Sequence, residues 1–280
     1  MVAALFALVA AAGVHLTWRV FVAGETGQRV DDLARLGAQH GQHRLWSLAE
    51  PLLDVVSVSF VVLGILTAMT ICLVRRRWVL AAQVAVLVAG SNATTQLLKY
   101  AVYDRPHLLP GWTGHNSLPS GHTTVAASVA VALLVAVPRA WRPVVAVLGA
   151  AWTAATGVST LIGQWHRPSD VVAAVLVVAV WGAAVCALGS RSTLDEPVRP
   201  GDTQATPGSY ATAGLLALGG LAAASVAGVA LVDLGTGVRN VPFEGDVTAY
   251  AGGVAGVVAA TALVFAALLL VRQATSRPRH

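Results

Sequence analysis

A histidine and an aspartate stand four residues apart in the segment His166-Arg167-Pro168-Ser169-Asp170. Residues at this spacing share one face of a helix, so the two side chains can meet. A carboxylate bound to one imidazole nitrogen fixes the tautomer and leaves the other nitrogen free to attack an electrophile. The pair indicates a nucleophilic histidine, although an interfacial His–Asp pair without chemistry fits the same pattern.

A second polar segment, Pro119-Ser120-Gly121-His122, opens an apolar run. The free amides at a helix N-terminus bind anions, and a glycine lets a phosphate approach closely. Ser120 can cap the helix or donate its hydroxyl to a phosphate oxygen, and His122 can hold or deliver a proton. Taken alone, the segment fits a simple helix cap beside an interfacial histidine better than it fits a phosphate site.

Two cations precede this segment. Lys99 ends an apolar run and is followed by Arg105-Pro106. Lysine and arginine often anchor helix ends at the membrane interface, but they also bind the equatorial oxygens of a transferring phosphoryl group. Two cations, an anion-binding helix start and a His–Asp pair on one side of a membrane together favour phosphate chemistry.

These segments resemble the type 2 phosphatidic acid phosphatase (PAP2) superfamily, whose motifs read K-x6-R-P, P-S-G-H and S-R-x5-H-x3-D. The resemblance covers about residues 90–175 and includes Ser159 at the start of the third motif. It implies that His166 attacks phosphorus, that Asp170 orients His166, and that His122 protonates the leaving alcohol and then activates water. It also implies that the phosphoryl oxygens are held by five positions: Lys99, Arg105, Ser120, the Gly121 amide and position 160. No metal and no cofactor are implied.

The sequence departs from the family pattern at two places. Only five residues separate Lys99 from Arg105, one fewer than in the motif. On a continuous helix this would turn Arg105 by about 100°, although Pro106 disfavours helix there and a loop can absorb the difference. Thr160 stands where the family has a phosphate-binding arginine. Arg167 is a candidate substitute, but on a helix it would point aside.

The composition predicts that helices in a membrane position these residues. Of the 280 residues, 56% are hydrophobic and 11% are charged, with a mean hydropathy of +0.71, whereas soluble domains carry about 25% charged residues. Strands cannot satisfy their backbone alone in lipid, so we predict an all-α, polytopic bundle. Eight apolar runs are long enough to span it: 2–22, 52–74, 78–98, 122–138, 143–162, 169–189, 210–233 and 248–271.

The runs divide into a six-span, PAP2-like core (1–190), a cytoplasmic linker (191–209) and a two-span C-terminal hairpin (210–272). The stretch 24–50 is predicted to be a loop that can hold a short amphipathic helix. Val2–Val14 is similar to a signal-peptide core, but it lacks a basic flank and the apolar run continues to Phe21, so we expect a retained first span.

Basic residues gather on one set of loops. With the N-terminus in the cytoplasm, the inner side carries ten of the 18 basic residues against three acids, in keeping with the positive-inside rule. We therefore expect cytoplasmic termini, a cell-membrane location and a site at the outer face. No basic stripe suggests nucleic-acid binding, and the cysteines, Cys72 and Cys186, have no zinc-like neighbours. The oligomeric state is not indicated.

Three functions remain open at this stage. The first is a lipid phosphatase acting on a polyprenyl mono- or diphosphate, phosphatidate or phosphatidylglycerol phosphate. The second is a family member with weakened hydrolysis that binds or senses phospholipid headgroups, as the threonine at position 160 suggests. The third is a lipid transporter whose path is lined by polar residues of the third span, which otherwise lock helices together: Ser91, Asn92, Thr94, Thr95 and Gln96.

Overall fold

The computed structural model describes residues 1–55, 58–109, 116–189, 194–195, 207–235 and 242–276, and within them it is all-α without strands. The predicted fold class is therefore confirmed. The helices are α1 (Val2–Phe21), α2 (Glu25–Gly37), α3 (Gln39–Val55), α4 (Val58–Val74), α5 (Trp78–Leu97), α6 (Gly121–Ala136), α7 (Arg142–Ile162), α8 (Pro168–Ala187), α9 (Pro207–Gly235) and α10 (Pro242–Thr275). A π-helical turn (Leu98–Val102) extends α5, and a 3₁₀ turn (Arg139–Trp141) precedes α7.

Six helical segments of the described chain are long and apolar enough to cross a membrane: Val2–Phe21, Trp78–Val102, Arg139–Ile162, Pro168–Ala187, Gly208–Gly235 and Gly245–Thr275. The chain is accordingly a multi-pass membrane protein. The predicted spans 52–74 and 122–138 correspond to shorter apolar helices, Val61–Val74 and Gly121–Ala136. Residues 52–55 belong to α3 rather than to the second predicted span.

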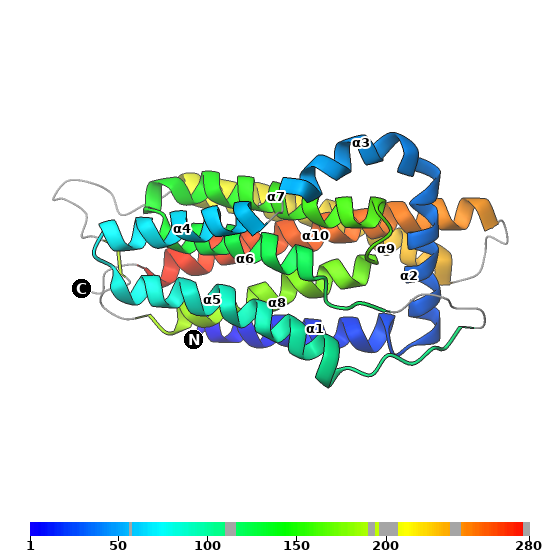
Figure 1. Ribbon diagram of the computed structural model, residues 1–280, viewed down its shortest axis with the longest axis horizontal. Helices are drawn as coiled ribbons and strands as arrows, with labels where there is room; N and C mark the ends of the chain where they lie inside the picture. The colour runs from blue at the N-terminus through cyan, green and yellow to red at the C-terminus, as the bar shows by residue number, and fades with distance from the viewer. Residues whose placement is uncertain (56–57, 110–115, 190–193, 196–206, 236–241, 277–280) are drawn as a thin grey trace.

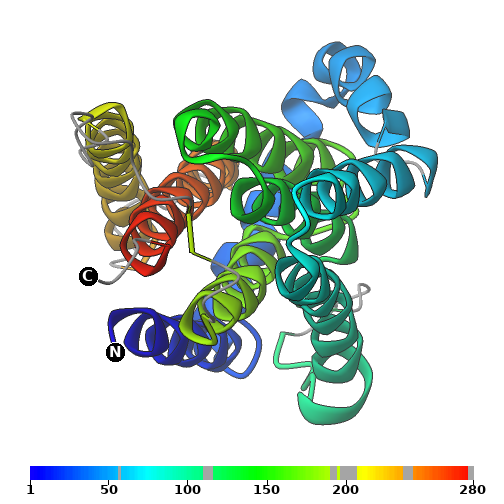
Figure 2. The same cartoon turned by 90° about the vertical axis from the view of Figure 1, so that its left-hand side faces the viewer.

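Helices α6 and α8 lie at the centre of the bundle when it is viewed end-on (Figure 2). Their sequences are apolar on every side rather than on one stripe, which is typical of a helix surrounded by other helices. Small residues allow the close approach, since Ala132, Ala136, Ala173 and Ala174 have no exposed surface. These two helices therefore form a rigid pair, and both begin at the same end of the bundle (Figure 1).

Helix α10 belongs to the same buried cluster as the helices before it. Phe265 is fully buried, and a Cβ added at Gly149 of α7 would lie 2.7 Å from its ring. Helix α9 lies at the edge of the bundle against α10 (Figure 2). Packing is thus continuous across the predicted boundary at 190–209, while the division into three units stays a prediction.

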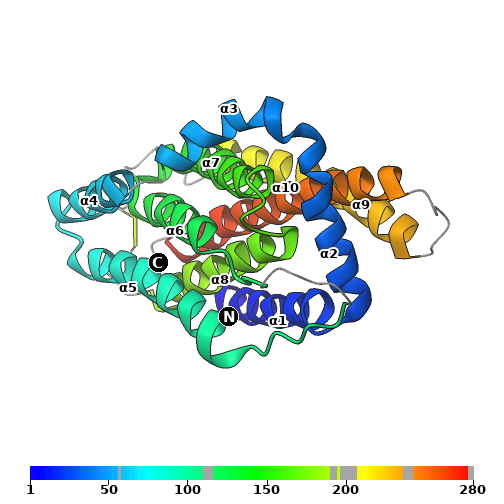
Figure 3. The same ribbon diagram turned by 45° about the vertical axis from the view of Figure 1, so that its right-hand side comes forward.

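The predicted loop at 24–50 is wrong, because the chain forms the helices α2 and α3 there. The amphipathic helix allowed within it is found: α2 stands across one end of the bundle (Figures 1 and 3). Two glycines let α2 pack closely against other segments. A Cβ added at Gly27 would lie 1.9 Å from the carbonyl oxygen of Val20, and one added at Gly37 would lie 2.1 Å from that of Asp246. Its polar residues gave the stretch the composition of a loop, but Gln28 and Asp31 are buried in contacts with other segments.

The polar residues of α5 link helices. The Trp181 indole N–H donates to the Thr94 hydroxyl at 3.0 Å, and the hydroxyls of Thr95 and Thr124 lie 2.9 Å apart. The Asn92 amide donates to a carbonyl of its own helix and, at 3.3 Å, to Ser128. Asn92, Thr94 and Thr95 therefore serve as links between helices.

Candidate active site

The three motif segments converge at the end of the bundle opposite the start of α1 and the end of α10 (Figure 1). Lys99 lies in the π-helical turn after α5, Ser120 is the N-cap of α6, and His166 stands two residues before α8. π-Helical turns are rare and often found at functional sites. The chain leaves helical geometry at Tyr103, so Arg105 lies in a loop and the shortened spacing is absorbed there.

His166 and Asp170 form the predicted pair. The Nδ1 atom of His166 lies 3.2 Å from Oδ2 of Asp170, and the same oxygen accepts the Arg167 backbone N–H at 3.1 Å. Asp170 is fully buried and His166 is 7% exposed. With Nδ1 occupied, Nε2 is the nitrogen of His166 left for a substrate.

His122 lies beside this pair. The ring centroids of His122 and His166 are 5.9 Å apart, in an edge-to-face arrangement. The ring of Trp165 is 5.5 Å from that of His122. His122 is exposed whereas His166 is buried, so solvent reaches the first imidazole more readily than the second. Two imidazoles at this separation can act on opposite sides of one small group.

Ser117 was not singled out by the sequence. Its hydroxyl donates to Oδ2 of Asp170 at 2.6 Å and lies 2.7 Å from Nδ1 of His166. The hydroxyl therefore touches both members of the His–Asp pair. Ser117 lies 49 residues from His166 in the chain, and no spacing rule connects the two. Its place just before the Pro119 segment was the only available signal.

The start of α6 is capped by Ser120 and bonded to α8. The Ser120 hydroxyl accepts the Thr123 amide at 3.3 Å, and the Ser120 amide donates to the Asp170 carbonyl at 2.9 Å. Ser120 thus caps α6 and ties it to α8. A Cβ added at Gly121 would meet no atom of the described residues within 4 Å. Packing within the described chain therefore leaves room for an incoming group at Gly121.

Lys99 and Arg105 line a common open pocket of about 400 Å³. The other described residues at its wall are Tyr100, Pro106, His107, Asn116 and Ser117. Arg105 donates to the carbonyls of Asn116 at 2.5 Å and Leu118 at 2.7 Å, so its guanidinium also holds the segment that leads into α6. Burial lowers the pKa of Arg105 from its ordinary value although the charge of Asp170 opposes this. An arginine nonetheless stays charged in proteins.

Thr160 and Arg167 have partners within the protein. The Thr160 hydroxyl donates to the Gly157 carbonyl at 2.7 Å, and the side chain is fully buried. The Thr160 carbonyl accepts the backbone amides of Trp165 and His166, so this residue shapes the turn that carries His166. Arg167 donates from Nη2 to Asp32 of α2 at 3.1 Å. Its role as a substitute for the missing arginine stays a prediction.

No cluster of three or more His, Cys, Asp or Glu side chains that could hold a metal occurs among the residues that the structure describes. His40 lies 3.8 Å from Asp246, and His107 lines the pocket of Lys99. His115 falls outside the described residues. Cys72 and Cys186 are buried free thiols.

Comparison with known proteins gives one match. The family model of the PAP2 superfamily matches residues 78–193, from the start of α5 to a point beyond the end of α8. No curated protein and no solved structure match. The matched range contains Lys99, His122, His166 and Asp170.

Proposed function

Because residues 78–193 are a PAP2 superfamily segment, which supports a phosphatase-type activity, we propose that the chain is a metal-independent membrane lipid phosphatase. The observation that carries this proposal is the meeting of two imidazoles. His166 and His122 lie 5.9 Å apart between centroids, with Asp170 behind His166 and Lys99 and Arg105 lining the adjoining pocket.

The proposed first step is attack by Nε2 of His166 on phosphorus. The P–N bond forms as the P–O bond to the lipid breaks, and His122 donates a proton to the leaving oxygen. Asp170 holds Nδ1 and stabilises the positive charge that develops on the imidazole. Lys99, Arg105, Ser120 and the Gly121 amide are proposed to hold the phosphoryl oxygens, where fixed positive charge stabilises the transition state most.

In the proposed second step His122 takes a proton from water, and the resulting hydroxide attacks phosphorus. The P–N bond breaks, inorganic phosphate leaves and His166 is restored. Dividing the displacement into two in-line steps is the usual gain from covalent catalysis. An imidazole gains and loses its proton more readily near neutral pH than other side chains do, so one histidine can serve as the acid and then as the base.

A lipid phosphate is the proposed substrate because the pocket lies at the ends of apolar membrane helices. The phosphate of a membrane lipid sits at this depth, whereas its hydrocarbon tail stays between the helices. Polyprenyl mono- or diphosphate, phosphatidate and phosphatidylglycerol phosphate all fit this description. We also propose that the site faces the outside of a cell membrane and that both termini are cytoplasmic, because the arginine-rich loops lie at the opposite end.

A second function is favoured by one observation. The Thr160 hydroxyl is engaged by its own helix, so a donor is missing where the family has an arginine. Removing one such donor typically costs about 10²–10³ in rate. A protein with weakened hydrolysis that binds or senses phospholipid headgroups is therefore the alternative.

The test is phosphate release by the purified protein in detergent with EDTA, measured on a panel of the three lipid classes. We expect release by the wild type, none by His166→Ala, and normal release by His40→Gln, a matched change of an exposed histidine on α3. A wild type that binds these lipids but releases nothing would support the sensor instead. Thr160→Arg then tests whether the missing guanidinium is the cause.

A further inference from the structure

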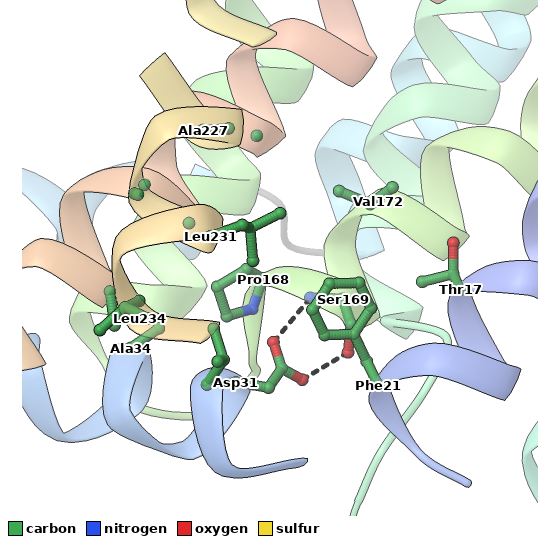
Figure 4. Close-up of a pocket in the computed structure, with 16 residues that line it drawn as sticks. Thr17, Phe21, Asp31, Ala34, Pro168, Ser169, Val172, Ala227, Leu231 and Leu234 are labelled. Carbon is green, nitrogen blue, oxygen red and sulfur yellow. Dashed lines mark hydrogen bonds between the residues drawn. The ribbon is translucent and has the colours of Figure 1, made fainter. Parts of the chain in front are cut away.

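Helix α2 touches the helix that carries the proposed catalytic pair. Figure 4 shows the Asp31 carboxylate turned toward Ser169 at the start of α8. One oxygen accepts the Ser169 backbone N–H at 3.2 Å, and the other accepts the Ser169 hydroxyl at 2.5 Å. Asp31 is 2% exposed, so these contacts are shielded from bulk solvent. Ser169 directly precedes Asp170, the residue that holds His166.

The neighbouring acid of α2 makes a parallel contact. Asp32 accepts from the Arg167 guanidinium at 3.1 Å. Asp31 and Asp32 thus bind the residues on either side of Pro168, in the first turn of α8. Two independent carboxylate contacts to one helix turn fix its position more firmly than packing alone.

The same face of α2 also binds the loop after the first motif. One turn before Asp31, the Gln28 amide donates to the Pro106 carbonyl at 2.6 Å, and its oxygen accepts the Leu108 amide at 3.3 Å. Pro106 follows Arg105 directly. One helix therefore links the segment that carries a proposed phosphate-binding arginine to the helix that carries Asp170.

The surroundings of Asp31 make it sensitive to pH. Asp170 and Arg167 are the charged groups that act on it from α8 and its N-cap, and Asp32 is next to it on α2. The residues that α1, α9 and α10 contribute to the adjoining pocket of about 110 Å³ are all uncharged. Burial, together with the charge of Asp170, raises the pKa of Asp31 to about 7. Most of the residues that line this pocket are apolar, which keeps the Asp31 carboxyl out of bulk water.

We propose that Asp31 is a positioning residue for the reaction, which fixes the first turn of α8 through Ser169 and so sets the alignment of Asp170 and His166. The inference rests on the proposed function. Asp31 does not touch the substrate, because it lies on the side of α8 turned toward α2. It acts on the attacking imidazole through one turn of backbone, and a change in its protonation alters that alignment.

The test compares two substitutions of Asp31 in the full-length protein, assayed for phosphate release from whichever lipid phosphate the wild type hydrolyses. Asp31→Ala removes both contacts, and we expect kcat to fall about 10- to 100-fold with KM changed less than about twofold, because a small misplacement of a reacting group has effects of this size. Asp31→Asn keeps both, since its oxygen accepts the Ser169 amide and its NH₂ donates to the hydroxyl. It mimics the protonated carboxyl.

The pH profile separates positioning from simple helix capping. The imidazoles contribute a pH dependence to both proteins, whereas only the wild type carries the titration of Asp31 as well. Asp31→Asn should retain most of the activity, and the ratio of its kcat to that of the wild type should change through about pH 7. Glu25→Gln is the matched control, since it changes an exposed acid on the same helix that pairs with Arg29. Its profile should follow that of the wild type.

Three outcomes would overturn the inference. One is an unchanged kcat in Asp31→Ala once activity is expressed per folded molecule. Another is a ratio of wild-type kcat to Asp31→Asn kcat that does not change with pH through about pH 7. The third is a wild type that releases no phosphate from any lipid of the panel, which removes the proposed function as well. The first two leave the phosphatase intact, so the two failures are distinguishable.

Discussion

Ser117 is the side chain whose removal tests the site most locally. Its hydroxyl donates to Asp170 and contacts Nδ1 of His166. A hydrogen bond to a charged group contributes about 1.5–3 kcal/mol. We expect Ser117→Ala to lower kcat roughly 10- to 100-fold with little change in KM, because the direct contact between His166 and Asp170 at 3.2 Å survives.

Steady-state kinetics in detergent measures this effect. The control is Ser225→Ala, which removes an exposed hydroxyl that bonds only to its own helix, at the Leu221 carbonyl. A Ser117→Ala variant as active as the control would show that the hydroxyl takes no part in aligning the imidazole.

The stability of the protein should depend on pH through Asp31. The folded-state pKa is about 7, against about 3.9 for an unfolded aspartate. Because the folded state binds the proton more tightly, this group favours folding below about pH 4, and that contribution is lost as the pH rises to about 7. The loss is roughly 3–5 kcal/mol at most.

Thermal midpoints in detergent between pH 4 and 8 check this. Asp31→Asn cannot ionise at this position, so its thermal midpoint should rise relative to that of the wild type as the pH increases across this range. A difference between the two proteins that is constant with pH would contradict the raised pKa.

The motif residues could be predicted from the sequence because each motif follows a local rule of residue spacing or helix capping. The spacing of four predicted that His166 and Asp170 meet, and Pro119-Ser120-Gly121 marks a helix start. The pair does meet, but His166 lies in the turn before α8 rather than on a helix face, and Asp170 reaches back to it from the first turn. Ser117 and Asp31 could not be found in this way. Their partners are 53 and 138 residues away, and only tertiary packing brings such pairs together.

At the scale of elements, α2 is the helix that was hardest to predict from the sequence. Its exposed face is charged, and its buried face carries glycine and hydrogen-bonding residues instead of large apolar ones. A buried polar residue is stable only when it finds partners, and those partners lie in other segments. Six of the apolar spans were predictable because length and hydropathy suffice for them, whereas the predicted spans 52–74 and 122–138 correspond to shorter apolar helices.

The packing of α2 against α10 can be tested at Gly37. An added Cβ would lie 2.1 Å from the Asp246 carbonyl oxygen, and backbone cannot yield as a side chain can. Overpacking of this kind costs about 1–3 kcal/mol. We expect Gly37→Ala to lower the thermal midpoint and, by shifting Asp31, to lower kcat as well.

Gly219→Ala is the comparison for this change. It lies in α9, where an added Cβ meets no described atom within 4 Å, and alanine is the better helix former. We expect it to leave both quantities unchanged or to raise the midpoint slightly. Equal behaviour of the two variants would mean that α2 is not held at Gly37.

At the scale of the whole molecule, the opposite end of the bundle is joined by one buried ion pair. Arg142 at the start of α7 donates to both oxygens of Asp195, at 3.0 and 2.7 Å. The Asp195 amide donates to the Ser276 carbonyl beyond α10 at 2.7 Å. Arg139 and Arg77 lie 3.5 and 3.8 Å from the same carboxylate. Asp195, which lies in the predicted linker, therefore binds both the start of α7 and the residue that follows α10.

The charged groups around Asp195 decide how much this residue stabilises the fold at a given pH. Burial alone would raise its pKa, but Arg142, Ser276 and Arg272 outweigh this and hold it below the ordinary value. A depressed pKa of an acid stabilises the fold above the unfolded value, near 4, and this stabilisation is lost as the pH falls through the folded one. The pair should thus be fully effective at neutral pH.

Breaking this pair should destabilise the junction that joins α7 to α10. Asp195→Ala leaves the fully buried Arg142 without its bidentate acceptor, and removing one partner of a buried pair typically costs about 3–5 kcal/mol. The double variant Arg142→Met, Asp195→Ala removes the stranded charge as well, so we expect it to be more stable than Asp195→Ala alone.

Thermal midpoints in detergent measure the stability of both variants. The reference is Glu25→Gln, which changes an exposed pair worth less than about 1 kcal/mol. A double variant that is no more stable than Asp195→Ala alone would contradict the coupling of Arg142 and Asp195.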